Sequence, residues 1–212
     1  RRQRQMCIRD SINKNGDISS SLAWDDLTGM RLDAGLVKEA RANEIRYVRE
    51  RTVYNKIPRS VAVRNGWKII RTRWVDINKG DDQDEEYRSR LVAKEIKKDN
   101  REDLFAATPP LEALQLLMAY AASDSSVHIM LSDVKRACFN ALAQRDVYVE
   151  LPEEDPEYQP GWVGKLRLAL YGTRDAAQLW QECLAGHLES IGFERGRSNP
   201  CVFFHRERSL RV

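Results

Sequence analysis

Asp133 stands at the end of an apolar run, where an acidic side chain invites a chemical interpretation. Residues 127–134 alternate in the manner of a strand, and the two-residue period places Asp133 on the same face as Val127 and Ile129. A carboxylate that continues an apolar face is costly if it is buried without a partner. Asp133 therefore either begins a turn where the strand ends or meets a cation.

Five cations form a second candidate group, on two segments that flank a polar turn. They are Arg71, Arg73, Arg88, Arg90 and Lys94. Residues 66–77, rich in Trp, Ile and Val, and residues 87–97 read as two strands of a β-hairpin closed by the acidic turn at 79–86. Such a surface could bind an anion, or its cations could simply offset the acidic turn. Periodicity does not distinguish the two.

The cysteines and histidines do not indicate a zinc site or a disulfide framework. They are Cys7, Cys138, Cys183 and Cys201, with His128, His187 and His205. No two cysteines stand at the spacing of a zinc ligand pair, and the histidines are equally scattered. Because the chain is long and has no secretion signal, we expect its cysteines to be reduced thiols. We expect His187 to pack at the edge of a helix rather than to bind a metal.

Periodicity predicts a mixed order of helices and strands. Apolar residues recur at helical spacing from Asp33 to about Val48, from Thr108 to about Ala122 and from Ala176 to Ile191. Besides the hairpin, further strands are expected at 127–134, 146–151, 162–170 and 200–205, with a connector at 52–60. We expect the helix at 108–122 to have a buried face. Hairpins beside a few long helices indicate an α+β fold rather than βαβ repeats.

The composition is that of a globular protein. The chain has 212 residues, of which 42% are hydrophobic and 32% charged, and no apolar run approaches the length of a membrane helix. Residues 1–60 carry 13 Lys and Arg against 8 Asp and Glu, so the net charge of +3 arises in this quarter. This excess permits nucleic-acid contact, but an ordinary solvated surface explains it as well. The first residue is not Met, and we expect the chain to be a piece of a longer one.

Several blocks of residues are informative as an ordered set. They are Arg73–Asp76 with Tyr87–Lys94, Asp103–Pro110, Asp133–Phe139, Val147–Pro152 and Leu168–Trp180. With these blocks the chain resembles, over about residues 53–212, the reverse transcriptase domain of copia-type LTR retrotransposon polyproteins. Each block is weak alone, but the set in this order and rough spacing is highly specific.

The resemblance implies an architecture. It is an α+β fold, the fingers and partial palm of a right-hand polymerase, truncated before a catalytic Asp-Asp hairpin. Residues 51–212 would form this domain. Residues 1–50 would be a basic spacer with one helix, which links integrase to reverse transcriptase.

The resemblance also implies template-directed nucleotidyl transfer with two Mg²⁺ ions. Asp133 would be the catalytic residue and a metal ligand, and Val134 would lend its backbone carbonyl to the metal. The residues that would meet the incoming nucleotide are Arg90, Lys94, Cys138, Phe139, Tyr171 and Gly172. Of these, Arg90 and Lys94 would face the triphosphate. Tyr171 and Gly172 would lie against the base pair and template.

The chain departs from the family pattern at three places. Adjacent aspartates occur only at 25–26 and 81–82, both before Asp133, so we expect these 212 residues alone to be inactive. Cys138 stands where the family has an aromatic residue that excludes ribonucleotides, and Phe139 follows it. Asp175 begins a stretch where many relatives have Gln and Pro, and this acid is expected to repel phosphate.

Two interpretations follow. One is a segment of an RNA-directed DNA polymerase that works inside a polyprotein, with integrase upstream and RNase H downstream. The alternative is a non-catalytic nucleic-acid-binding remnant of a decayed retroelement. In both, the expected partners are an RNA or DNA template-primer and deoxynucleoside triphosphates, with no membrane. The expected location is intracellular, in a cytoplasmic particle or the nucleus.

Overall fold

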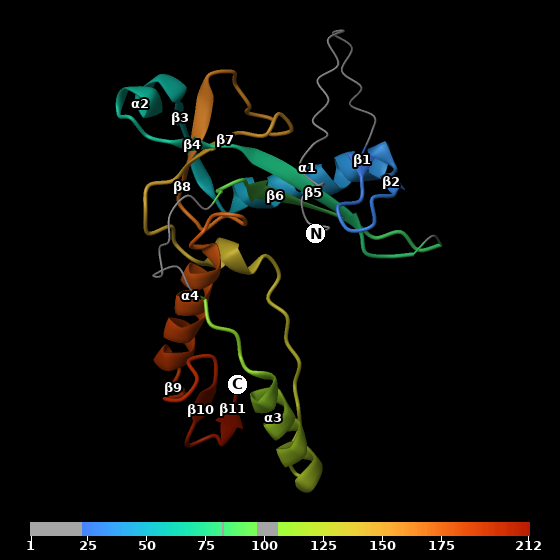
Figure 1. Ribbon diagram of the computed structural model, residues 1–212, viewed down its shortest axis with the longest axis vertical. Coiled ribbons are helices and arrows are strands. Elements are labelled where there is room, and N and C mark those ends of the chain that lie inside the picture. The colour runs from blue at the N-terminus through green and yellow to red at the C-terminus, as the bar shows by residue number, and fades with distance from the viewer. Residues whose placement is uncertain (1–22, 82, 97–105) are drawn as a thin grey trace, which may run out of the picture.

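A computed structural model describes residues 23–81, 83–96 and 106–212. Mixed helices and small sheets form its upper part, and one long helix runs down from it toward the C-terminal strands (Figure 1). The helices are α1 (Ala34–Glu50), α2 (Arg59–Arg64), α3 (Leu111–Ser123), α4 (Ala176–Ser190) and the 3₁₀ helix η1 (Ala137–Asn140). The expected mixed α and β character is confirmed.

The central sheet joins distant parts of the sequence. Its order is β3-β8-β7-β4, from β3 (Tyr54–Pro58), β8 (Trp162–Leu166), β7 (Tyr148–Glu150) and β4 (Ile69–Ile70). The β7–β4 pair is parallel, and the other two pairs are antiparallel. Smaller sheets are β1 (Ala23–Trp24) with β2 (Arg31–Leu32), and β9 (Glu194–Arg195), β10 (Phe203–His205) and β11 (Leu210–Arg211).

The predicted hairpin forms as β5 (Thr72–Asn78) and β6 (Tyr87–Ala93), paired from Thr72 with Ala93 to Asn78 with Tyr87. Opposite residues of an antiparallel pair share a face. Arg88 and Arg90 therefore lie on one face, together with Arg73, which is opposite Val92. The other face, with Ser89 and Leu91 buried, packs toward α1.

The predicted helix α1 is capped as expected. The Asp33 carboxylate accepts a hydrogen bond from the Leu36 N–H at 2.9 Å, which satisfies one of the free donors of the first turn. The buried side chains Val37, Ile45 and Val48 lie along the helix face that the periodicity predicts. This helix lies beside β5 and β6 in Figure 1.

The main core lies between α1, the hairpin and the central sheet. It consists of Val48, Val53, Tyr54, Ile70, Leu91, Ala93, Phe139, Val147, Val149, Leu151, Leu166 and Leu170. A smaller cluster joins η1 to the start of α4 through Cys138, Ala141, Ala169, Ala176 and Leu179. Residues 136–142 therefore contribute side chains to both clusters, and this packing holds the segment in place.

The lower part is less well packed. The C-terminal end of α4 packs on the last strands through Leu188, Phe193 and Phe203, and α3 reaches β11 through Arg211, whose guanidinium lies 4.6 Å from the Tyr120 ring centre. No residue of α3 is buried, so the expected buried face of this helix is wrong. None of the helices in the described ranges has the length and apolar character needed to span a membrane.

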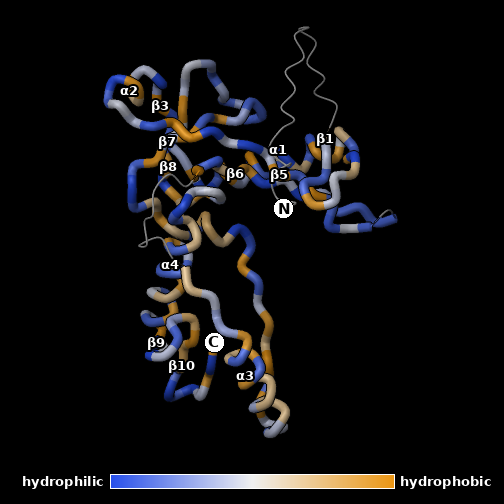
Figure 2. The backbone as a smooth tube through the Cα atoms, viewed as in Figure 1, coloured by the Kyte–Doolittle hydropathy of each residue, from blue (hydrophilic) through white to orange (hydrophobic). Residues whose placement is uncertain are grey.

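The predicted strand at 127–134 does not form. The segment is extended without a sheet partner, and the side chains of Ile129, Met130 and Leu131 are exposed. A strand requires hydrogen-bonding neighbours, and no strand of the described residues lies beside this one. Figure 2 shows hydrophobic colour along this extended segment and on α3.

Two other expectations are corrected by the pairing. The single strand at 66–77 is two strands, β4 and β5, which belong to different sheets and are separated at Arg71. The connector at 52–60 contains β3, an edge strand of the central sheet, followed directly by α2. Pro58 ends that strand, a position where a missing N–H donor is tolerated.

Candidate functional site

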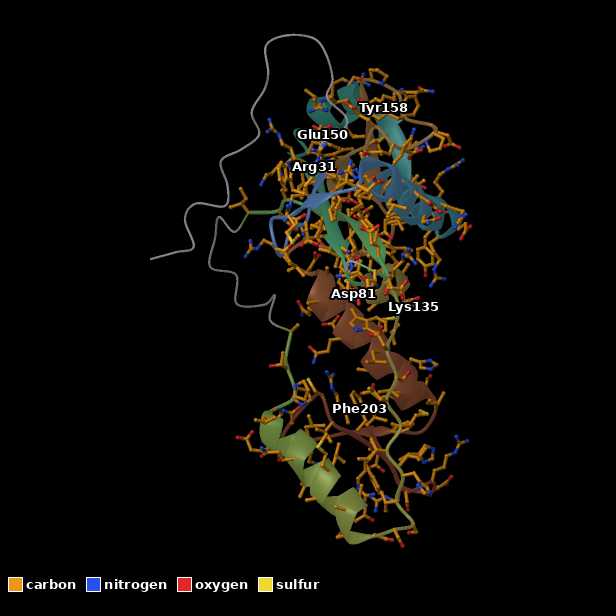
Figure 3. All side chains as sticks on the ribbon, turned by 90° about the vertical axis from the view of Figure 1, so that its right-hand side faces the viewer. Arg31, Asp81, Lys135, Glu150, Tyr158 and Phe203 are labelled. Carbon is orange, nitrogen blue, oxygen red and sulfur yellow. The ribbon has the colours of Figure 1, made fainter. Side chains whose placement is uncertain are left out.

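Asp133 and Val134 lie in the extended segment that precedes η1, and both are exposed. No hydrogen bond or ion pair joins the Asp133 carboxylate to the other predicted site residues that the structure describes. Figure 3 shows Lys135, two residues further, near the level where this segment rejoins the body of the molecule. Asp133 is therefore accessible to a ligand, and it is not the buried end of a strand.

The chain turns sharply at Arg136, immediately after this segment. Arg136 has φ 51° and ψ 45°, a left-handed conformation that is uncommon for a residue with a side chain. Its carbonyl accepts the Phe139 N–H at 2.9 Å and so begins η1. The turn directs Cys138 and Phe139 into the interior, where they are 8% and 1% exposed.

Phe139 lies between two tyrosines. Its ring is 5.5 Å from that of Tyr171 in a tilted arrangement and 6.0 Å from that of Tyr47 in a stacked one. Cys138 points into the smaller cluster beneath α4. Burial raises the pKa of the Cys138 thiol, so this side chain is a neutral packing group.

Arg90 connects the hairpin to this aromatic group. Its guanidinium lies 5.4 Å from the Tyr171 ring centre, and its buried Nε has no hydrogen-bond partner among the residues that the structure describes. Burial raises the pKa of Tyr171, and the Cys138 thiol adds to the shift while Arg90 opposes it. The Arg90 guanidinium is therefore close enough to the Tyr171 phenol to affect its pKa.

Tyr171 and Gly172 extend the contact to the end of β6. The Tyr171 carbonyl accepts the Ala93 N–H at 2.7 Å, and the Gly172 carbonyl accepts the Glu95 N–H. Gly172 has φ 81°, and a Cβ at this position would lie 2.1 Å from the Ala93 carbonyl oxygen. Only glycine permits this approach. Lys94, exposed, follows Ala93 and donates its N–H to the Arg71 carbonyl at 2.7 Å.

A network around Arg145 fastens the same region. Its guanidinium donates to both carboxylate oxygens of Asp175, at 2.7 and 3.0 Å, and to both of Glu95. The Arg174 N–H also donates to Glu95, at 2.9 Å. Burial alone would raise the pKa of each carboxyl, but the hydrogen bonds from Arg145 outweigh it and hold both pKa values below the ordinary range.

This network corrects one expectation and shows what sequence reasoning missed. Asp175 was expected to repel phosphate, but it is 7% exposed and its charge is met by Arg145. Neither Arg145 nor Glu95 was foreseen, because Arg145 lies 30 residues from Asp175 and 50 from Glu95. The acid itself becomes a signal only once the fold buries it, since a buried carboxylate requires a cation or hydrogen-bond donors.

Two of the five hairpin cations, Arg73 and Arg90, have partners outside the acidic turn. Arg73 pairs with Asp26 at 2.7 Å, and Arg90 lies against Tyr171. The turn residue Asp81 instead accepts hydrogen bonds from the N–H groups of Gln83 and Asp84. Asp26 already meets the charge of Arg73, so the cations that keep this face suited to an anion are Arg88 and Arg90.

The structure thus brings together a hairpin cation, Tyr171–Gly172 and the turn that carries Cys138 and Phe139, while Asp133 stands apart on the preceding segment.

This arrangement can be compared with known proteins. A family model described as reverse transcriptase (RNA-dependent DNA polymerase) matches residues 55–211. The chain belongs to this reverse transcriptase family.

Relatives with known names are retrotransposon polyproteins, so the resemblance to copia-type elements is confirmed. The Retrovirus-related Pol polyprotein from transposon TNT 1-94 of Nicotiana tabacum is 28% identical over 152 residues, which cover 69% of this chain and 11% of the relative. The corresponding polyprotein from transposon RE1 of Arabidopsis thaliana is 30% identical over 144 residues, covering 64% of this chain and 10% of the relative. The chain therefore spans about a tenth of the length of these relatives. No solved structure gives a significant match.

Proposed function

We propose that residues 51–212 form the fingers and part of the palm of an RNA-directed DNA polymerase within a retrotransposon polyprotein, with residues 1–50 as a preceding spacer. The observation that carries this is the meeting of Arg90, Tyr171 and Phe139. Three separate blocks of the family pattern supply these residues, and the fold places them in contact. A reacting nucleotide would need a cation for its phosphates, an aromatic residue against its base and a fixed turn beside its sugar, all held close together.

In this proposal, Arg90 and Lys94 meet the triphosphate, since a cationic hairpin face attracts phosphate oxygens. Tyr171 and Gly172 lie against the incoming base pair and the template, and the contact of Gly172 with Ala93 holds this segment against the hairpin. Cys138 and Phe139 pack beneath the part of the site that would hold the sugar. The partners are an RNA or DNA template-primer, deoxynucleoside triphosphates and the rest of the polyprotein.

Two Mg²⁺ ions are the cofactor that membership of this family suggests. In the parts of the chain that the structure describes, no three His, Cys, Asp or Glu side chains are placed so that they could hold a metal ion. These residues therefore do not fit a two-metal centre by themselves. We propose that the Asp133 carboxylate and the Val134 carbonyl supply part of the ligand set. The remaining carboxylates would come from an Asp-Asp hairpin, a pair that does not occur after Asp133 in these 212 residues.

The cationic face of the hairpin favours a second candidate as well. A non-catalytic nucleic-acid-binding remnant would retain this face, because cations supply the sequence-independent part of nucleic-acid binding. Such a remnant would bind template without turnover. The two candidates differ in whether Asp133 matters once the rest of the polyprotein is present. In either case, we expect no primer extension from these 212 residues alone.

The test replaces Asp133 with Asn in the longer polyprotein product that contains this chain. If the proposal is correct, primer extension falls roughly a thousandfold while template affinity changes little, because the Asp133 carboxylate would help to hold a metal ion that lowers the barrier by several kcal/mol. The matched control is Asp146→Asn, which removes an exposed carboxylate paired with Lys165. Extension that survives in Asp133→Asn would refute the role of Asp133. Template binding without extension in the unmodified protein would favour the remnant.

A further inference from the structure

The buried acid Glu44 has no role in the site described so far. It lies on α1, before the region matched by the family model, and it is 1% exposed. Its Oε2 accepts the Arg136 Nε–H at 2.7 Å, and its Oε1 has no partner among the described residues. A buried carboxylate is tolerated only where a cation meets it. Glu44 is therefore tied to Arg136, across 92 positions of sequence.

Arg136 is the residue that turns the chain between Asp133 and Cys138. Its left-handed backbone has a conformational cost that the surroundings must offset, since nothing local favours it in an arginine. The side chain is held from two sides by α1. Glu44 accepts its Nε–H, and the Tyr47 ring lies 4.4 Å from its guanidinium carbon.

The same helix also holds the residues that follow the turn. Tyr47 stacks on Phe139, and Arg51, at the end of α1, donates a hydrogen bond to the Asn140 side chain. Phe139 in turn contacts Tyr171, and Tyr171 contacts Arg90, so the contacts of α1 extend to the hairpin. A single helix thus contacts the turn, the aromatic side chain and the end of η1.

We propose that Glu44 and Arg136 are a positioning pair that fixes the left-handed turn, and through it sets Asp133 relative to Cys138 and Phe139. Neither residue touches substrate in this proposal, which rests on the proposed nucleotide site. The helix α1 is then a working part of that site, although it lies in the segment assigned to a spacer. Loss of the pair should loosen the turn without removing any group that contacts the nucleotide.

The test uses the longer polyprotein product and two readouts. Glu44→Gln should raise the hydrogen-exchange rates of the Phe139 and Ala141 N–H groups, which bond within the turn, roughly tenfold. Exchange in β3 and β8 should not change. The same variant should raise the KM for deoxynucleoside triphosphates by about tenfold and lower kcat much less. Glu39→Gln, an exposed acid on the same helix, is the matched control and should alter neither.

A second variant covers the case in which Glu44→Gln fails to fold. Glu44→Met with Arg136→Gly removes both charges and supplies a residue that adopts the left-handed conformation freely. This protein should fold, with faster exchange at Phe139 and a raised KM. Unchanged exchange at Phe139 and Ala141 in the folded variants would overturn the pair. Faster exchange with an unchanged KM would overturn its link to the nucleotide. Activity that survives Asp133→Asn would refute the proposed function, whatever the exchange shows.

Discussion

The guanidinium of Arg90 lies 5.4 Å from the centre of the Tyr171 ring. This contact joins β6 to the turn before α4, two segments about 80 residues apart in sequence, and it places a cation on the hairpin face that also carries Arg73 and Arg88. A cation over an aromatic ring is attracted to the face of the ring. The contact therefore fixes the direction in which the hairpin presents its charge.

Replacement of Arg90 tests whether this charge binds nucleotide. In the longer polyprotein product, Arg90→Ala should raise the KM for deoxynucleoside triphosphates by about tenfold to a hundredfold, because a charge-assisted hydrogen bond contributes about 1.5–3 kcal/mol. Steady-state kinetics with varied triphosphate measures it. Arg64→Ala, which removes an exposed arginine on α2, is the control and should have no effect. Equal KM values for the two variants would exclude Arg90 from the nucleotide site.

Gly172 permits a test of the β6 contact that needs no activity. Gly172→Ala would place a Cβ 2.1 Å from the Ala93 carbonyl oxygen at φ 81°, so both clash and backbone strain oppose it. We expect the free energy of unfolding in urea to fall by at least about 2–3 kcal/mol. The control is Gly66→Ala, where φ is also positive but no atom lies within 4 Å. That variant should lose only about 1 kcal/mol, and a similar loss at both positions would mean that the contact with Ala93 is easily relaxed.

The network of Arg145 should give the protein a distinct pH dependence. The pKa values of Glu95 and Asp175 lie below the ordinary 4.5 and 3.8 because Arg145 bonds to both, which outweighs their burial. The unfolded chain therefore takes up protons at higher pH than the folded one. The stabilisation is complete above the ordinary values and is lost as the pH falls through them to the depressed ones.

Arg145→Met should reverse that dependence. It leaves Glu95 and Asp175 close together and mostly buried without a cation, which raises rather than lowers their pKa values in the folded state. We expect a loss of about 3 kcal/mol at neutral pH that becomes smaller as the pH falls. Urea unfolding at several pH values measures it. Lys165→Met, which breaks the exposed pair with Asp146, should cost less than about 1 kcal/mol. A loss in Arg145→Met that does not vary with pH would contradict the network.

Local patterns predicted much of the fold, and their failures have a common cause. The hairpin β5–β6 and the helices α1 and α4 were predicted from periodicity and capping, which act over a few residues. The apolar segment 127–134 also has strand periodicity, but a strand depends on neighbouring strands, which are often far away in sequence. In the described residues this segment has none, so the pattern alone could not decide its structure.

In the candidate site, too, some residues could be predicted from the sequence and others could not. Family motifs predicted Arg90, Tyr171 and Gly172, and the fold brings these residues together. The supporting residues Glu44 and Arg145 could not be predicted, because each acts on a partner at least 30 residues away that no local pattern indicates. Such charges become visible only when burial shows that a carboxylate must have a cation.

Cys138 is the position at which the structure changes an expectation most. The family resemblance implies an aromatic residue at this position, so Phe in place of Cys138 would be expected to exclude ribonucleotides. In this chain, however, Cys138 is 8% exposed and packs against Ala141, Ala169 and Ala176. Phe139 meanwhile occupies the space between Tyr47 and Tyr171. A second ring at 138 would therefore have to displace a well-filled cluster.

Cys138→Phe should accordingly destabilise the protein by about 1–3 kcal/mol, the usual cost of overpacking. The ratio of ribonucleotide to deoxynucleotide incorporation should change little, because the new ring packs inward rather than toward the sugar. Urea unfolding and single-nucleotide incorporation by the longer polyprotein product measure the two effects. Cys138→Ala, which only reduces volume, is the control and should leave the ratio unchanged. A stable Cys138→Phe protein with strongly reduced ribonucleotide incorporation would show instead that position 138 faces the sugar.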